Sequence, residues 1–516
     1  MSKISDEKLT AIEWIENNKE EIIELLMDIW RHPETAFREY RSAKAHCDIL
    51  RKYGFKVTRN IAGMPTAFVA EWGSGKPVIG SYAEYDATPE QSQDAVPYRK
   101  PIVEYGPGFS DAHHSLGVGS TAGVIAAKMA MEKHGIEGTI KILGTPAEKV
   151  CAKAWLASKG YLDGYDAFIT NHPWDTTTVT WETHLGSYWA VVFSFKCDEP
   201  EKWMAYAPEL GMGPRHPGAV DAVVTMHQLT KMLKDRMLPF TAHWTLNEWI
   251  MMAGQMTADN IPPRIAQINY AWRSPSLETQ EQIWKVLENC ARKAAEVTGC
   301  TVETTWVSKT RPGLPNLAIA RLAYRNLELV GPPQWSKEDI EFAREIQRNL
   351  GLEPMEKPLP EGLTPPEEAE KLRRQILPPN VKNFGSDDNS EFTWHAPCAW
   401  IHVAGGFGIK PYPGVRYPRW VQFCVNGTGI NHKMTLTTAK AIATSIVELF
   451  TTPSELQKAQ DEFKERTGGG IGGSKWLPPL LPKELDPPIH LRWPEWIINS
   501  YESELDTTKA KWHVPY

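Results

Sequence analysis

Side chains that commonly bind zinc or manganese occur at four separate places in the sequence. Sites for these ions use imidazole nitrogens and carboxylate oxygens, and a catalytic site keeps one coordination position open for water. The candidates of these types are Asp111, His113, His114, Glu148, His172 and His432. They are far apart in the sequence, so their spacing alone does not show that they meet. A histidine beside a proline, such as His172, is commonly structural, and a lone aspartate is common in turns, so both interpretations stay open.

The elements around these residues follow the pattern of a mostly parallel sheet. After helices within 6–54, the pattern predicts two short strands within 64–83, a helix over 118–134, a strand over 139–143, a helix over 147–159 and a strand over 167–170. Strands that alternate with helices favour a parallel sheet, whose active site lies at the carboxyl ends of its strands. The segment 84–117 is expected to be a long loop, and long loops in such domains are often functional.

A different pattern begins near residue 186. Strand, helix, strand, strand, helix and strand follow one another over 186–308, which is typical of the βαββαβ ferredoxin-like unit. The α/β pattern then returns, with helices expected over 315–330, 336–350 and 435–451 and a surface loop over 353–380. We predict an α/β protein in which a mostly parallel-sheet catalytic domain, residues 1–185 and 309–516, contains an inserted lid domain, residues 186–308. Residues 467–516 are expected to form an extended C-terminal tail.

Composition and charge exclude several classes of function. The 516 residues carry 56 basic and 63 acidic side chains without a basic stripe, so a nucleic-acid partner is not expected. No run of 18 apolar residues is present, and the N-terminus resembles an amphipathic helix more than a signal peptide, so we expect a cytoplasmic protein without membrane contact. The seven cysteines are scattered and do not suggest a disulfide framework. Some of the 21 tryptophans could line a pocket for a flat, apolar ligand.

Eight short motifs occur in a specific order along the chain. In sequence order they read HPETAFREY, AEYDATPEQSQ, DAHHSLG, PAEK, NHP, RNLELVGPP, NHK and RTGGG. From about residue 10 to about residue 485, the chain thus resembles the aminobenzoyl-glutamate hydrolase branch of the aminoacylase/carboxypeptidase-type metallopeptidases. The resemblance implies a catalytic domain with a βαββαβ lid that also forms a homodimer. It also implies hydrolysis of an amide bond by metal-activated water, with a glutamate as general base.

The resemblance assigns roles to particular residues. Asp111, His113 and His172 correspond to metal ligands, with His114 as the alternative to His113, and Glu148 corresponds to the general base. Asp86 corresponds to a residue that orients a ligand histidine, with a plain turn aspartate as the alternative. Glu84, two residues earlier, faces either the metal or a turn.

The chain departs from the family pattern at Lys149, where a second glutamate normally binds one of two metals. An ammonium group cannot ligate a cation, so we predict one zinc or manganese ion per chain. Lys149 and His432 would then act as non-metal electrophiles beside it. In the alternative interpretation, Lys149 points to solvent at the start of a helix.

In the lid, the resemblance places a carboxylate-binding Asn260 and Arg273 and a further substrate-binding histidine, His243. A turn asparagine and an edge-strand arginine are the structural alternative. Asp388 and Glu391 lie in a segment that matches another family motif, and we expect them to be loop residues near the site.

These observations predict a metal-dependent amidohydrolase whose substrate is an aromatic or N-acyl amino acid. The histidine-alanine stretch that the family has early in the lid is replaced here by a different segment, residues 199–220. Because the metal site and the lid are altered and tryptophan is abundant, hydrolysis of another C–N bond on an aromatic compound, as in a deaminase, is the second hypothesis. A protein that keeps the fold and binds a ligand without catalysis is the third.

Overall fold

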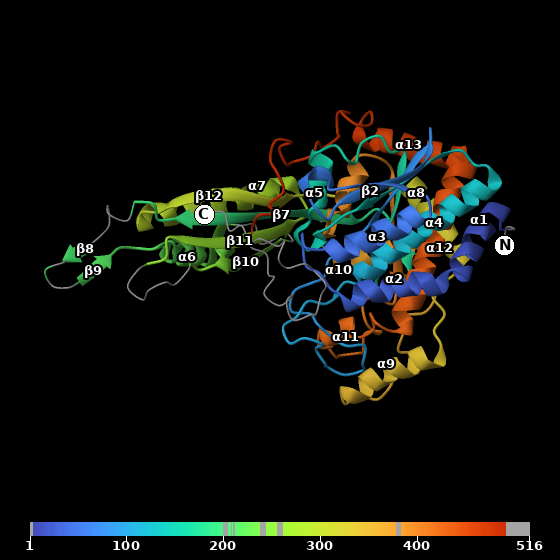
Figure 1. Ribbon diagram of the computed structural model, residues 1–516, viewed down its shortest axis with the longest axis horizontal. Coiled ribbons are helices and arrows are strands. Elements are labelled where there is room, and N and C mark those ends of the chain that lie inside the picture. Colours follow the sequence, from blue (N-terminus) through green and yellow to red (C-terminus); the bar gives the residue numbers. More distant parts are fainter. Residues whose placement is uncertain are drawn as a thin grey trace.

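The computed structural model describes residues 4–199, 205–207, 209, 212–237, 244–254, 262–377 and 383–491. Two sheets lie in separate parts of the molecule, with the larger sheet and most helices on the right of Figure 1 and the second sheet on the left. The fold is therefore mixed α/β, with one sheet that has a parallel centre and a separate antiparallel sheet. None of the helices in these ranges is long and apolar enough to cross a membrane.

The larger sheet has seven strands in the order β1-β2-β4-β3-β5-β14-β6. The strands are β1 (Lys56–Arg59), β2 (Phe68–Ser74), β3 (Val78–Ala83), β4 (Gly138–Gly144), β5 (Ala167–Trp174), β6 (Thr178–Val179) and β14 (Cys398–Ala404). The four central strands β4, β3, β5 and β14 run parallel, whereas β1, β2 and β6 join the sheet antiparallel. The parallel strands are buried along most of their length, as expected for a sheet covered by helices.

Helices surround this sheet (Figure 1). They are α1 (Asp6–Asn17), α2 (Lys19–Arg31), α3 (Tyr40–Lys52), α4 (His113–His134), α5 (Lys153–Ser158), α8 (Leu317–Val330), α9 (Lys337–Asn349), α10 (Pro366–Ile376), α11 (Trp420–Phe423), α12 (Gly429–Thr451) and α13 (Pro453–Thr467). The buried helices α4 and α12 pack closely because α4 carries small residues: a Cβ atom on Gly123 would lie 2.8 Å from Ile442 Cγ2. Near the start of α4, which begins at His113, a Cβ atom on Gly117 would lie 2.1 Å from the backbone oxygen of Glu84, so this end of the helix packs directly on the segment after β3.

The prediction of a surface loop over 353–380 is wrong in part, because α10 lies within it. Pro366 stands in the first turn of α10, where its missing N–H is not needed, and acidic residues follow it. Arg373 and Arg374 lie in the last turn, so the charges complement the helix dipole.

The second sheet contains β7 (His184–Lys196), β10 (Thr245–Met252), β11 (Ile265–Ser274) and β12 (Thr301–Lys309) in the order β10-β11-β7-β12, with all neighbours antiparallel. The chain order is β7, α6 (Ala219–Met237), β10, β11, α7 (Leu277–Thr298) and β12, apart from the two-stranded hairpin of β8 (Ala205–Ala207) and β9 (Met212–Arg215) that follows β7. The short strand β13 (Asn383–Ser386) pairs parallel with the first residues of β7. It therefore joins the second sheet to the segment that carries Asp387 and Asp388.

A buried ion pair ties together the chain segments that leave the second sheet. Arg311, two residues after β12, is fully buried, and its Nε atom donates to Glu391 Oε2 at 2.9 Å. The same guanidinium donates to the backbone oxygen of Leu477 at 2.8 Å and contacts His395. Glu391 was expected from the sequence to be a loop residue. Through Arg311 it connects the segment that follows β12 to the C-terminal segment around Leu477.

Replacing Arg311 by leucine should lower the free energy of unfolding by about 3–5 kcal/mol, because Glu391 would stay buried without its counter-ion. Thermal unfolding followed by tryptophan fluorescence measures the loss, and protease cleavage within residues 468–491 should become faster. Arg325→Leu is the control, because Arg325 is about half exposed and its partners Glu448 and Glu455 keep Lys8 and Lys458 as counter-ions. The loss expected there is about 0–1 kcal/mol. Equal effects of the two substitutions would contradict this role for the Arg311–Glu391 pair.

Candidate metal centre

Charged and imidazole side chains gather at the carboxyl ends of the parallel strands. Glu84 and Asp86 follow β3, Glu148 and Lys149 form a short 3-10 turn after β4, and His172 lies near the end of β5. His113 begins α4, and Asp387 and Asp388 follow β13. This is the edge of the sheet where the strand pattern predicted the site.

His113 faces these side chains, and Asp86 fixes its orientation. Asp86 Oδ1 lies 2.8 Å from His113 Nδ1, so Nε2 is the nitrogen turned to the site. Asp86 Oδ2 accepts a hydrogen bond from the backbone N–H of Lys149 at 2.9 Å. Burial and the Lys149 ammonium oppose protonation of the imidazole, but Glu84 and Asp86 outweigh them and raise the pKa of His113 to about 9. The surroundings of His113 therefore favour positive charge.

Lys149 points into the site and not to solvent. Its Nζ atom lies 2.5 Å from Asp111 Oδ2, 3.0 Å from Glu148 Oε2 and 3.1 Å from His113 Nε2. Burial opposes ionisation of Asp111, yet Lys149 dominates and lowers the pKa of this carboxyl group to about 2. Burial also disfavours a charged Lys149, but Asp111 and Glu148 raise its pKa well above the ordinary value. The lysine is thus a fixed positive charge among carboxylates.

A second lysine, Lys153, lies deeper in the same group of side chains. It is fully buried and forms ion pairs with Glu84 Oε1 and Asp388 Oδ1. Its backbone N–H donates to Asp388 Oδ2 at 2.8 Å. Nothing in the sequence marked Lys153 as a site residue, because a lysine at the start of a short helix is usually a surface residue.

Three buried donors could hold a divalent cation: one ligand atom each from Glu84, His113 and His172 lies within 4.8 Å of the other two. Glu84 Oε2 is buried and has no hydrogen-bond partner, which is typical of an oxygen that binds a cation. His172 Nδ1 lies 2.7 Å from the backbone oxygen of Pro173, so its Nε2 is free for a ligand. Two imidazoles and a carboxylate are a donor set that suits zinc or manganese.

The predicted ligands therefore come together only in part in this geometry. His113 and His172 share the candidate set, whereas Asp111 contacts Lys149 and lies 3.3 Å from Gln422 Nε2. Glu84, which the sequence left open between a metal and a turn, stands in the third position. Gln422 on α11 belongs to no motif that the sequence analysis recognised.

The other two candidate histidines point elsewhere. His114 Nε2 lies 3.1 Å from the backbone oxygen of Asn426, and its ring packs on Phe109. His432 Nε2 lies 3.2 Å from Met27 Sδ on α2. Among the contacts described, neither imidazole touches Lys149 or Glu148, so a catalytic role for His432 stays a prediction.

Strained turns place the catalytic candidates. Ala112 and Ala147, which precede His113 and Glu148, have positive φ angles of 55° and 57°. Such conformations cost free energy in alanine and persist where neighbouring groups hold them. Glu39 Oε1 accepts a hydrogen bond from the Ala147 N–H at 2.8 Å, opposite the bond that Asp86 makes to Lys149. Two carboxylates thus hold the turn from either side.

Among the predicted lid residues, Arg273 reaches the neighbourhood of the site. Its Nε atom donates to Ser386 Oγ at 2.6 Å, and its guanidinium lies 5.2 Å from the ring centroid of Tyr188. Ser386 directly precedes Asp387, so Arg273 lies beside the segment that enters the carboxylate group. His243 and Asn260 lie outside the described residues.

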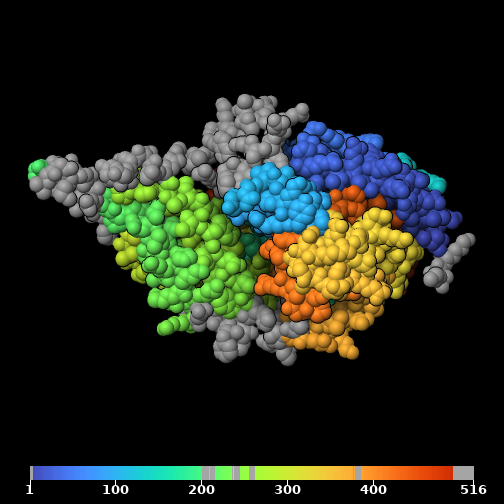
Figure 2. All heavy atoms as spheres, turned by 90° about the horizontal axis from the view of Figure 1, so that it is seen from below, coloured from blue at the N-terminus to red at the C-terminus, as the bar shows by residue number. Residues whose placement is uncertain are grey.

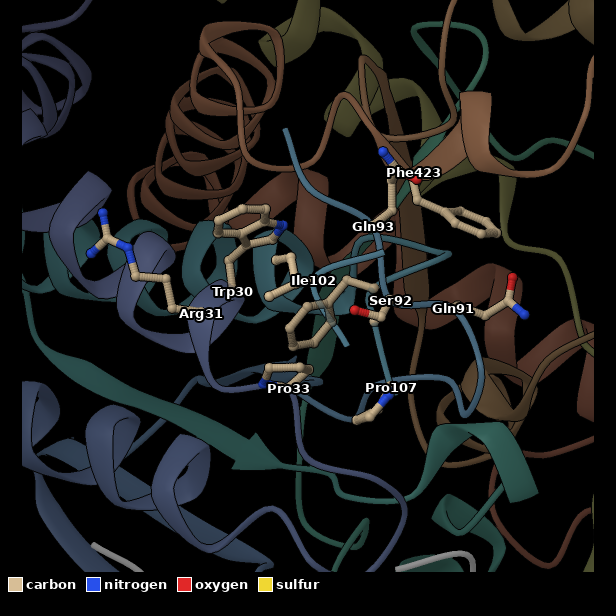
Figure 3. Close-up of a pocket in the computed structure, with 11 residues that line it drawn as sticks. Trp30, Arg31, Pro33, Gln91, Ser92, Gln93, Ile102, Pro107 and Phe423 are labelled. Carbon is tan, nitrogen blue, oxygen red and sulfur yellow. The ribbon is translucent and has the colours of Figure 1, made fainter. Parts of the chain in front are cut away.

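Two hollows mark the surface near this edge of the sheet. Figure 2 shows one between the green second-sheet part, the light-blue loop after β3 and the orange segment before α12. Figure 3 shows a small pocket between the end of α2 and the loop over 91–109, lined by residues such as Trp30, Gln93 and Phe423. None of the site carboxylates lines this pocket. The pocket is therefore separate from the group of charged side chains at the carboxyl ends of the strands.

Replacing Lys153 by methionine should lower the free energy of unfolding by about 3–5 kcal/mol, because Glu84 and Asp388 would lose a buried counter-ion. Urea unfolding measures this, with Lys128→Met as the control because Lys128 pairs with the exposed Glu132. Millimolar Mn²⁺ should restore part of the loss in the Lys153 variant, because Glu84, Asp387 and Asp388 also offer oxygens within 4.8 Å of one another. An unchanged unfolding free energy would contradict the role of Lys153.

Comparisons with known proteins show which proteins this chain resembles. No profile of a known protein family matches the chain. It is 29% identical to one of the subunits of p-aminobenzoyl-glutamate hydrolase from Escherichia coli (strain K12) over 469 residues, which cover 88% of this chain and 94% of the relative. It is 26% identical to Xaa-Arg dipeptidase of Mus musculus over 313 residues, 57% of this chain and 65% of that protein.

A solved structure supports the fold. The aminobenzoyl-glutamate utilization protein of Klebsiella pneumoniae superposes with a TM-score of 0.53 at 13% identity, covering 84% of this chain and 98% of that one. The curated relatives named above are hydrolases, in agreement with the predicted enzyme class. The resemblance that the sequence motifs indicated, to the aminobenzoyl-glutamate hydrolase branch of the aminoacylase/carboxypeptidase-type metallopeptidases, is confirmed.

Proposed function

We propose that the chain hydrolyses an amide C–N bond between an aromatic or acyl group and an amino acid, with one zinc or manganese ion per chain. The observation that carries the proposal is the convergence of Glu84, His113 and His172 next to the Glu148 carboxylate and the Lys149 ammonium. The p-aminobenzoyl-glutamate hydrolase activity in the name of the E. coli relative indicates the type of substrate. The curated dipeptidase also cleaves an amide bond, as its name states.

Glu84, His113 and His172 are the residues that we assign to the metal, with Asp111 as the ligand that the family resemblance adds. A divalent ion there would polarise a carbonyl group and acidify water. Glu148 is the proposed general base. Burial opposes its ionisation, but Lys149 and His113 keep its pKa below the ordinary value, so it is a carboxylate that can accept a proton from the attacking water.

Lys149 is the proposed electrophile for the carbonyl oxygen. Asp111 and Glu148 hold its ammonium group in place before the reaction, so stabilising negative charge on that oxygen needs no reorganisation. Arg273 is suited to the carboxylate of the amino-acid part, since a guanidinium binds carboxylates with two parallel hydrogen bonds. His243 and Asn260 remain proposed partners on the same side of the substrate.

The βαββαβ order of the second sheet supports a ferredoxin-like lid over residues 186–308 that also forms a homodimer. Its edge strand β10 exposes Trp249 and Ile250, at 40% and 51% of their surface. An apolar edge strand is a surface that proteins usually cover. A second copy of the lid is the partner that we propose.

Glu148→Gln should lower kcat by about 10²–10⁴-fold, because the general base is lost while the shape of the site is kept. Release of 4-aminobenzoate from N-(4-aminobenzoyl)-glutamate measures kcat, and elemental analysis should find the same metal content. Activity before and after chelation tests the metal requirement. An unchanged kcat would favour the non-catalytic hypothesis, and ammonia release from aminoaromatic compounds without amide cleavage would favour the deaminase-like one.

The ammonium group at Lys149 leads to the proposal of a single metal. A unit positive charge about 4 Å from another costs about 4 kcal/mol at an effective dielectric constant near 20, and a divalent ion costs more. Around Glu84, carboxylates still outnumber ammonium groups, so one cation is favoured there. A second cation, next to Lys149, would be repelled by its ammonium group.

Lys149→Glu should therefore raise metal binding from about one to about two ions per chain, as measured by titration and elemental analysis. Lys149→Met removes the charge without adding a ligand and should stay near one. Lys141→Glu, in the middle of β4 where Lys141 pairs with Glu71 of β2, is the control for an added carboxylate. Two fully occupied ions in the unmodified protein would contradict this partition of ligands.

A further inference from the structure

Three aromatic side chains surround His172 on one side of the candidate metal centre. The ring centroids of Trp174, Trp400 and Phe407 lie 6.1, 5.9 and 5.9 Å from that of His172. Trp174 and Trp400 come from the paired strands β5 and β14, and Phe407 comes from the turn after β14. We call Trp174, Trp400 and Phe407 the aromatic wall.

The turn after β14 is shaped to bring Phe407 to this place. Gly405 has a φ of 121°, which side chains larger than glycine rarely adopt. A Cβ atom on Gly406 would lie 2.7 Å from Pro173 Cβ, so this turn packs directly on the residue next to His172. Phe407 then contacts Trp174, with ring centroids 5.5 Å apart and planes tilted by 47°.

The exposure of the wall differs from that of a core cluster. Trp400 is buried, but Trp174 and Phe407 are each partly exposed at the open end of the parallel strands. The indole Nε1 of Trp400 is buried without a hydrogen-bond partner. Two partly exposed rings beside a candidate metal ligand form an apolar surface that a ligand can reach.

The rest of the site has the opposite character. Around Glu84 and Lys149 the described neighbours are carboxylates, ammonium groups and imidazole. An amide substrate of the proposed kind has one end with a carboxylate and one end without charge. The charged end suits Arg273, and the uncharged end needs an apolar surface next to the metal ligands.

We propose that Trp174 and Phe407, backed by Trp400, bind the aromatic ring of the acyl group and make the protein selective for benzoyl-type amides. This inference rests on the proposed amide hydrolysis and adds the position and chemical class of the acyl subsite. Aromatic rings gain from offset and edge-to-face contacts beyond the burial of their area, which an acetyl group cannot exploit.

Trp174→Leu and Phe407→Leu should each lower kcat/KM for N-(4-aminobenzoyl)-glutamate by about 10-fold or more, corresponding to the loss of an aromatic contact. For N-acetylglutamate the same variants should lose less than about threefold. Trp72→Leu is the matched control, because Trp72 is also partly exposed but lies on β2, three strands from β5. An equal loss for both substrates, or none for the aromatic one, would overturn the proposal.

Binding of 4-aminobenzoate, measured by calorimetry, separates the subsite from the reaction. The unmodified protein should bind this acid, and both wall variants should bind it at least about fivefold more weakly, with Trp72→Leu unchanged. If neither amide is hydrolysed but this pattern of binding is seen, the proposed reaction fails and the aromatic subsite stands. No binding by the unmodified protein, or binding that both variants keep, overturns the subsite.

Discussion

The geometry of the site depends on two ammonium groups that replace solvent among buried carboxylates. Lys149 and Lys153 are four residues apart and enter the same group of acids at different depths. Burying several carboxylates would be unfavourable without them, since like charges repel and desolvation penalises each one. Lys153 neutralises the inner part near Asp388, and Lys149 neutralises the outer part near Asp111. One oxygen of Glu84 is left without a hydrogen-bond partner, close to the imidazoles of His113 and His172, and this is where a cation is favoured.

This charge arrangement constrains the backbone. The turn before Glu148 has a positive φ at Ala147, and it is held by the Glu39 carboxylate on one side and by Asp86 on the other. Asp86 therefore acts on both the His113 ring and the Lys149 backbone. The Asp86 carboxylate thus connects His113, a proposed metal ligand, to Lys149, the proposed electrophile. The positions of these two residues therefore cannot change independently.

Much of this could be predicted from the sequence, and the failures have physical causes. The strand and helix pattern identified the parallel centre of the sheet, but hydrophobic periodicity carries no strand direction, so the antiparallel edges β1, β2 and β6 were not foreseen. The motifs brought His113 and His172 together and singled out Lys149. They could not reveal Gln422, because its contact with Asp111 depends on how a short helix packs. His432 lies in a matching motif, but its helix turns it toward Met27.

The site is divided between two kinds of surface, and the division follows from the order of the strands. The segments that follow β3 and β4 carry acids and a lysine. The neighbouring strands β5 and β14 instead place aromatic residues around His172, with Trp174 at the end of β5, Trp400 within β14 and Phe407 in the turn after it. His172 stands at the boundary, with the Asp387 carboxylate 4.0 Å from its Nε2 on one side and the Trp400 and Phe407 rings on the other. A ligand that reaches this imidazole therefore meets charge in one direction and ring faces in the other. Such a boundary sets the orientation of a substrate whose two ends differ in polarity, because reversing it would place a carboxylate against indole and an aromatic ring against ion-paired carboxylates and ammonium groups.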